Sequence, residues 1–155
     1  MVGDLTPHRG DLEPDEEYDG VRFDGASFED AAAGSCHFLD CSFTGVCFDG
    51  GRLRKARFTD TALRDTRFVA TDLAETGWLD TTLTGCALAG GQVFSAALRR
   101  VTFRDCKLDS VNFRGGALTD VTFENCLLRD ADSDSVQLVT LAPLLARHLG
   151  ITVTD

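Results

Sequence analysis

The sequence predicts an all-β solenoid, a narrow square rod in which the chain winds through stacked coils of parallel strands. Three observations support this fold class. An apolar residue, almost always Phe or Leu, recurs at every fifth position from Phe23 to Leu128; a small or β-branched residue stands two positions before it; and Gly, Asp or Asn is frequent two positions after it. The phase of this repeat is unbroken, so one structural unit accounts for most of the chain.

A period of five excludes the two ordinary secondary structures. On an α-helix, residues five apart are rotated by roughly 140° at each step, which spreads the Phe/Leu set around the whole cylinder. On a straight strand, side chains alternate with a period of two, so an odd repeat sends successive apolar residues to opposite faces. The chain must therefore turn within every repeat.

Each repeat divides into inward, outward and corner positions. The Phe/Leu residue, which we call the centre, and the small residue two positions before it point inward, and the residue between them points outward. The two residues after the centre form a corner, where Gly, Asp and Asn tolerate the positive φ of a tight turn. Four such sides make a coil of about 20 residues, so the 22 centres make about 5–6 coils stacked roughly 4.8 Å apart.

The repeats resemble those of a known family, the pentapeptide-repeat proteins, whose motif is A-(D/N)-L-x-x with Phe alternating for Leu. The resemblance is carried by stretches such as 26–30 (ASFED), 71–75 (TDLAE) and 111–115 (VNFRG). It implies a right-handed quadrilateral parallel β-helix. It does not imply one function, because members of the family have many roles. Among them are quinolone-resistance and self-immunity proteins that engage DNA gyrase as DNA mimics.

The phase of the repeat divides the chain into three predicted parts. Residues 1–20 form an acidic leader, either partly disordered or an N-terminal cap, residues 21–138 form the pentapeptide-repeat solenoid, and residues 139–155 form a C-terminal helix and tail. Thr140 can cap that short helix, and Gly150 can end it. Its apolar stripe consists of Leu141, Leu144, Leu145 and Leu149. We expect the helix to cap the last coil and to join two copies as a homodimer.

Composition and charge restrict the function. The net charge is −10, but residues 1–20 alone hold seven acidic side chains and one arginine, whereas residues 21–132 are nearly balanced, with 16 acidic and 13 basic residues. The basic residues spread over several predicted walls with acids between them, so we expect no direct binding to nucleic acid. No apolar run of 18 residues and no signal-like leader are present, so we expect no membrane contact and a cytoplasmic location.

Catalysis, cofactors and metals find no support in the sequence. Five of the six cysteines, all but Cys47, occupy the inward small position, so we expect reduced, buried thiols. His37 should face outward beside Cys36 and Cys41, and no C-x-x-C pair exists, which argues against a zinc site. The glycines follow the repeat and form no phosphate-binding loop. We therefore expect no enzyme, no cofactor and no metal.

Sorting the outward positions by the 20-residue coil identifies candidate partner-binding residues. One corner column holds Asp40, Asp60, Asp80, Arg100 and Asp120. A stripe of carboxylates can imitate nucleic-acid phosphates or meet a basic groove, although Asp is also simply a good corner residue. Beside the column, Leu39 and Leu79 should point outward as a small apolar strip, and Val69 and Phe94 are further exposed apolar candidates.

Two functional hypotheses follow. The first is a protein-binding DNA mimic that binds DNA gyrase or another topoisomerase and modulates or protects it, as in quinolone resistance. The alternative is a structural scaffold whose walls hold an unrelated protein partner, with the charges placed only by the needs of folding.

Overall fold

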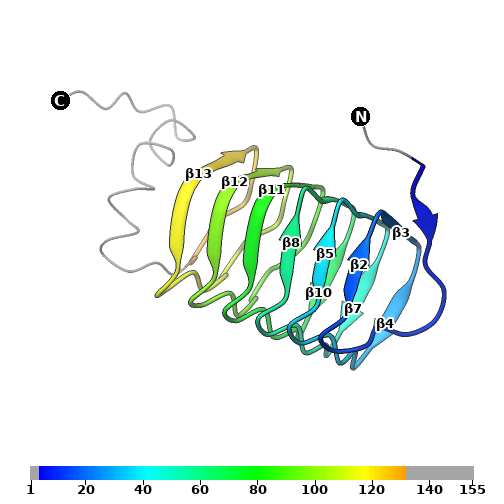
Figure 1. Ribbon diagram of the computed structural model, residues 1–155. Coiled ribbons are helices and arrows are strands. Elements are labelled where there is room, and N and C mark those ends of the chain that lie inside the picture. Colours follow the sequence, from blue (N-terminus) through cyan, green and yellow to red (C-terminus); the bar gives the residue numbers. More distant parts are fainter. Residues whose placement is uncertain (1–3, 132–155) are drawn as a thin grey trace.

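The computed structural model describes residues 4–131, and every regular element in this range is a β-strand (Figure 1). The strands are β1 (Thr6–Pro7), β2 (Glu17–Asp19), β3 (Val21–Asp24), β4 (Ser27–Glu29), β5 (His37–Leu39), β6 (Ser42–Thr44), β7 (Cys47–Asp49), β8 (Arg57–Thr59), β9 (Ala62–Arg64), β10 (Arg67–Val69), β11 (Gly77–Thr84), β12 (Ala97–Arg104) and β13 (Ala117–Glu124). The strands pair in parallel, and from β2 onward paired residues lie 20 positions apart, as Phe58 and Trp78 do. The predicted all-β solenoid is confirmed, with about five coils.

Each coil has four walls, one for each centre. We number them 1 to 4 in the order in which the chain passes through them. Wall 1 carries β2, β5, β8 and the first halves of β11, β12 and β13, and wall 2 carries β3, β6, β9 and the second halves of those long strands. Wall 3 holds the three-stranded sheet β4–β7–β10. Wall 4 is joined by single parallel bridges that run from Ala32 through Arg52, Asp72 and Gln92 to Asn112. Figure 1 shows the strands of wall 1 aligned along the rod.

The corners follow the predicted period. Every fifth residue from Gly10 to Asp130 has a positive φ. Glycine, aspartate or asparagine fills most of these positions, because their backbones tolerate the left-handed region. Lys55, Ala70 and Arg100 are corner residues that lack this advantage, with φ of 66°, 47° and 52°.

The core is filled by the centres, which stack from coil to coil. On wall 1 the ring centroids of Tyr18, Phe38, Phe58 and Trp78 follow one another at 5.3, 5.0 and 4.1 Å, all close to parallel. The irregular centres Ala33 and Val93 are also buried. The indole N–H of Trp78 donates to the Thr76 hydroxyl at 2.8 Å, so this buried ring has its hydrogen bond.

The N-terminal segment lies against the first coil. β1 pairs with β3, and β2 pairs with β5. Leu12 is buried and joins the core cluster, and the His8 ring lies 4.8 Å from that of Phe23. These contacts cover the apolar end that a solenoid otherwise exposes to water.

A candidate protein-binding surface

The structure brings the predicted acidic column together at the corner between walls 1 and 2, which we call the Asp corner. Asp40, Asp60, Asp80, Arg100 and Asp120 occupy it in successive coils, each with a positive φ. Asp40 is half-exposed, and the other four are exposed. The corner backbone is held by bonds to the next coil, for example from the Asp40 N–H to the Thr59 carbonyl at 2.9 Å. The carboxylates therefore stand on a rigid support.

Arg100 interrupts the negative charge of this column. Its Nε and Nη2 donate to the two carboxylate oxygens of Asp80 at 2.5 and 2.9 Å, a bidentate pair between neighbouring coils. The hydrogen bonds from Arg100 hold the pKa of Asp80 below its usual value. The carboxylates of the column without an ion pair among the described residues are thus those of Asp40, Asp60 and Asp120.

A shallow groove of about 430 Å³ runs beside these carboxylates. It is lined by Leu5, Asp40, Cys41, Ser42, Asp60, Thr61, Ala62, Asp80 and Thr82. Its floor is made of short residues from β6, β9 and β11, because wall 2 carries Ser, Ala and Thr at its outward position here. The groove combines a carboxylate wall with a flat, hydroxyl-bearing floor.

Leu39 and Leu79 lie on wall 1 directly before the Asp corner. Both are paired in register with Thr59, which stands between them, and all three are half-buried. The His37 ring nitrogen Nε2 lies 3.1 Å from the Thr59 hydroxyl. The strip therefore adjoins the acidic column, as the sequence predicts, but it is interrupted by a polar residue.

The other sequence candidates are placed as follows. Val69 is 44% exposed and Phe94 is half-buried. Leu127 is 55% exposed and was not among the sequence candidates. Its outward position in the repeat is the sequence signal that predicts an exposed apolar residue there.

The predicted dimer residues Leu141, Leu144, Leu145 and Leu149 lie outside the described residues. No group of His, Cys, Asp or Glu within residues 4–131 is arranged to hold a metal ion.

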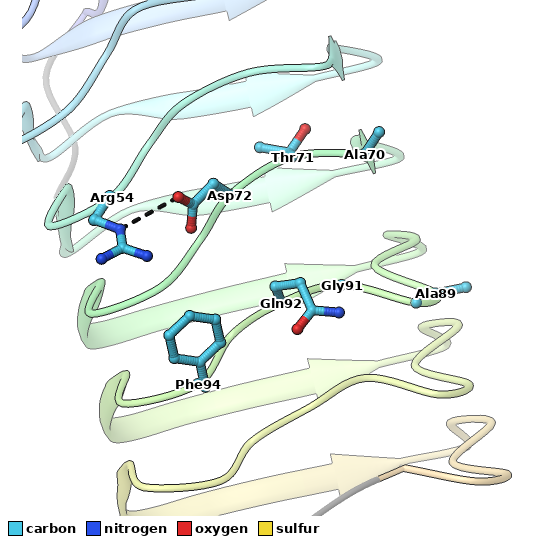
Figure 2. Close-up of a pocket in the computed structure, with 9 residues that line it drawn as sticks. Arg54, Ala70, Thr71, Asp72, Ala89, Gly91, Gln92 and Phe94 are labelled. Atoms are coloured by element: carbon cyan, nitrogen blue, oxygen red, sulfur yellow. Dashed lines mark hydrogen bonds and ion pairs between the residues drawn. The ribbon is translucent and has the colours of Figure 1, made fainter.

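A second groove lies at the corner between walls 3 and 4 (Figure 2). It has a volume of about 390 Å³ and is lined by Arg54, Ala70, Thr71, Asp72, Ala89, Gly90, Gly91, Gln92 and Phe94. The Arg54 guanidinium contacts Asp72 at 3.3 Å and Glu75 at 3.4 Å, and it lies 5.7 Å from the centre of the Phe94 ring. Positions 54 and 94 lie in one 20-residue column, two coils apart, but the column alone does not reveal this contact, because Ala74 stands between them.

No helix among the described residues has the length and hydropathy required to cross a bilayer.

Two protein-family models match the chain. The one described as "Pentapeptide repeats (8 copies)" matches residues 22–60. The one described as "Pentapeptide repeat region" matches residues 76–142. Together they cover well over half of the 155 residues. No protein of curated function matches the sequence.

Several solved structures are similar to this chain, among them two described as pentapeptide repeat proteins and one of a resistance protein. The one from the Arabidopsis thaliana thylakoid lumen is 22% identical, and the match covers 66% of this chain and 76% of that chain with a TM-score of 0.57. QnrB1, a plasmid-mediated fluoroquinolone resistance protein, is 16% identical over 96% of this chain and 95% of its own, with a TM-score of 0.43. HetL, which is involved in heterocyst differentiation regulation in the cyanobacterium Nostoc, is 13% identical over 79% and 90%, with a TM-score of 0.37. The first likeness supports a shared fold.

Proposed function

Because this chain belongs to the pentapeptide-repeat family, we propose that it is a non-enzymatic, cytoplasmic protein-binding rod whose Asp corner imitates nucleic-acid phosphates and binds DNA gyrase. The proposal includes a right-handed quadrilateral β-helix and a homodimer formed through residues 139–155. It needs no cofactor and no direct contact with nucleic acid. Binding to gyrase in this way would modulate the enzyme or protect it from quinolones.

The observation that carries the proposal is the column of corner carboxylates with its groove. Asp40 and Asp60 stand in successive coils, separated by about the inter-strand spacing of 4.8 Å, and make no ion pair among the described residues. Rigidly held, unpaired carboxylates attract a basic surface and speed its association. The fixed corner backbone spares the ordering entropy that a flexible acidic tail would lose on binding.

Two observations favour a second candidate function. The Arg100–Asp80 pair neutralises the column in its middle, which a continuous phosphate mimic would not require. Corner aspartates also occur outside the Asp corner, at Asp30 and Asp65. A scaffold that holds an unrelated protein partner through other walls accounts for both facts.

A gyrase supercoiling assay tests the first proposal. Full-length protein is titrated into the assay with and without a fluoroquinolone, beside a variant carrying Asp40→Asn, Asp60→Asn and Asp120→Asn. Asn keeps the corner conformation but removes the charge, so we expect the inhibition or drug protection of the wild type to weaken by about tenfold or more.

The matched control carries Asp30→Asn, Asp65→Asn and Asp130→Asn at three other corners, so it loses the same number of charges, and it should behave as the wild type does. Loss of the effect in both variants would assign it to overall charge rather than to the Asp corner. A folded wild-type protein without any effect on gyrase would overturn the proposed partner.

A further inference from the structure

Three buried cysteines stand in one column inside the rod, and the proposed gyrase surface does not use them. Cys86, Cys106 and Cys126 occupy the inward small position of wall 3 in successive coils, and none is more than 2% exposed. The Lys107 N–H donates to the Cys86 carbonyl at 2.9 Å. The Leu127 N–H donates to the Cys106 carbonyl at 3.1 Å, so the backbones are held in register. We call these three residues the cysteine column, and no other two of the six cysteines are 20 positions apart.

The spacing of the cysteine column suits a disulfide between neighbours. Coils are stacked about 4.8 Å apart, which lies within the roughly 4.4–6.8 Å that separates the Cα atoms of bonded cysteines. Cys106 has a cysteine on either side at this distance. Cys86 and Cys126 are two coils apart, about 9.6 Å, which is too far for a bond between them. The geometry of the column therefore allows only disulfides that include Cys106.

The thiols of neighbouring coils also contact one another. The hydrogen bond with Cys106 holds the pKa of Cys86 below its ordinary value of 9.0, and the hydrogen bond with Cys106 raises the pKa of Cys126. Cys86 is therefore the member of the column that ionises most readily. The thiolate is the form of cysteine that attacks oxidants, so oxidation of the column begins at Cys86.

Burial restricts the oxidant to a small, uncharged molecule. The column belongs to the buried core, so a bulky disulfide or a protein thiol cannot reach Cys86 while the coils are closed. A hydroperoxide of the size of hydrogen peroxide needs only a brief local separation of two coils. Cys47, in contrast, is half-buried at an outward position of wall 3 and is accessible to larger reagents.

We propose that the cysteine column is an oxidation site, at which hydrogen peroxide joins Cys86 to Cys106 by a disulfide between two neighbouring coils. Each thiol of the column now donates to a carbonyl of the preceding coil at 3.3–3.4 Å, a weak hydrogen bond whose loss costs little. The disulfide closes a loop of about 20 residues and so stabilises the coils that carry Asp80 and Arg100. The inference does not depend on the identity of the partner at the Asp corner.

The reaction balances with hydrogen peroxide alone. The Cys86 thiolate attacks one peroxide oxygen, the O–O bond breaks, and the departing hydroxide takes up the proton of the former thiol as water. The Cys106 sulfur then attacks the sulfur of the Cys86 sulfenic acid, the S–O bond breaks, and a second water leaves with the Cys106 proton. Two thiols are oxidised to one disulfide, and the peroxide is reduced to two waters. Cys126, whose pKa is raised, remains a thiol.

Peptide mapping after oxidation tests the site. The starting protein is the full-length chain with Cys47→Ser, which removes the accessible thiol and prevents disulfides between copies. It is treated with hydrogen peroxide, alkylated after denaturation, and digested with trypsin without reduction. Cleavage after arginine and lysine places the three cysteines of the column in separate peptides, 68–99, 105–107 and 115–129. Thiols are counted in the denatured protein before and after the treatment.

Two variants of the starting protein serve as a matched pair. Cys106→Ala and Cys126→Ala each keep two thiols in the column, but only Cys126→Ala keeps two that are neighbours. We expect Cys126→Ala to lose both of these thiols to a disulfide, as the starting protein does, and Cys106→Ala to lose none. The fluorescence of Trp78 reports whether each variant is folded.

We expect peptide 105–107 to be linked to peptide 68–99. Amide exchange at Lys107 should slow by about tenfold or more in the oxidised protein, because the disulfide opposes the separation of its two coils. Linkage of 105–107 to 115–129, no loss of thiols in the folded starting protein, or an equal loss in Cys106→Ala would each overturn the proposal. The peptide map of the starting protein decides the question even where a variant does not fold.

Discussion

At the residue scale, the inward small position does more than leave room for the centre. Several buried threonines and cysteines there donate one side-chain hydrogen to two backbone carbonyls, one from the preceding coil and one from two residues earlier. Thr81 contacts the Phe58 and Leu79 carbonyls at 3.2 and 3.0 Å. Cys106 makes the same pair of contacts. The same geometry recurs at Cys41, Thr61, Thr71, Cys86 and Cys126. The cysteines therefore act as weaker counterparts of threonine.

Thr81→Val tests the contribution of this bridging hydroxyl. Valine has nearly the same shape, so the variant loses the donor and little packing, and we expect a loss of about 1 kcal/mol in the free energy of unfolding. The reverse change, Val101→Thr, serves as the control, because Val101 pairs with Thr81 in the next coil of the same column. It should be close to neutral, since an equivalent pair of carbonyls lies within reach. Urea unfolding measures both, and equal costs would contradict the bridging role.

The thiol of Cys106 should make the fold sensitive to alkali. The hydrogen bond with Cys126 lowers the pKa of the Cys106 thiol, whereas the hydrogen bond with Cys86 and burial raise it. The net result is a pKa of about 11 instead of the ordinary 9.0. A pKa that is higher in the folded state stabilises the fold below pH 9.0, and that contribution is lost as the pH rises towards about 11. Cys106→Ser should therefore show a shallower loss of stability over this range in urea unfolding. Identical pH profiles for the two proteins would contradict it.

At the element scale, ion pairs between coils reinforce the register of the strands. Arg100 pairs with Asp80, and Arg104 with Glu124 at 2.7 Å, in both cases across 20 positions. A slip of one residue would turn the inward set outward, so the main determinant of register is still the buried centre. The pairs are exposed, and their contribution is correspondingly small.

Arg100→Gln tests whether the pair governs the charge of Asp80. The hydrogen bonds from Arg100 lower the pKa of Asp80, so in the wild type their stabilisation is present above the ordinary carboxylate range and is lost as the pH falls through the lowered value. In the variant, the pKa of Asp80 should return towards its usual value. Carboxyl carbon chemical shifts measured during a pH titration give this pKa directly. An unchanged pKa would mean that Arg100 does not make the pair in solution.

The sequence predicts the corners well and the contacts between distant coils less well. A corner needs only a local property, tolerance of positive φ, and the period of five places it from Gly25 to Asp130. The 20-residue columns place Asp80 beside Arg100. They do not reveal that Arg54 bends across Ala74 towards Phe94, because that contact depends on the rotamers of a long side chain. The His8–Phe23 contact is also beyond such reasoning, since it lies outside the repeat.

At the scale of the whole molecule, the rod is nearly one-dimensional. Each coil contacts its neighbours in sequence order, and pairing runs from β2 to β13 without any long-range closure. The stability of such a protein is approximately a sum of coil and interface terms, so its ends can open without the middle. The single tryptophan, Trp78, lies in the central part of the described coils and reports on that middle.

Two substitutions in the same stack distinguish local from global unfolding. Phe58→Ala removes the ring stacked 4.1 Å from Trp78, and we expect a loss of about 3–5 kcal/mol in the unfolding followed by Trp78 fluorescence. Tyr18→Ala removes the half-buried ring at the N-terminal end of that stack, 5.3 Å from Phe38. Because this end can open by itself, the fluorescence transition should remain close to that of the wild type, while amide exchange accelerates in β3 and β5.

The comparison of the two variants shows whether the coils that carry the two corners unfold together or separately. If Tyr18→Ala shifts the Trp78 transition as much as Phe58→Ala does, the coils unfold as one cooperative unit. The stability is then not a sum of separate coil and interface terms. If the effect stays at the end, the N-terminal coils that carry Asp40 can open while the coils that form the groove around Phe94 stay folded. The Asp corner and the groove would then differ in local stability, although they belong to one continuous solenoid.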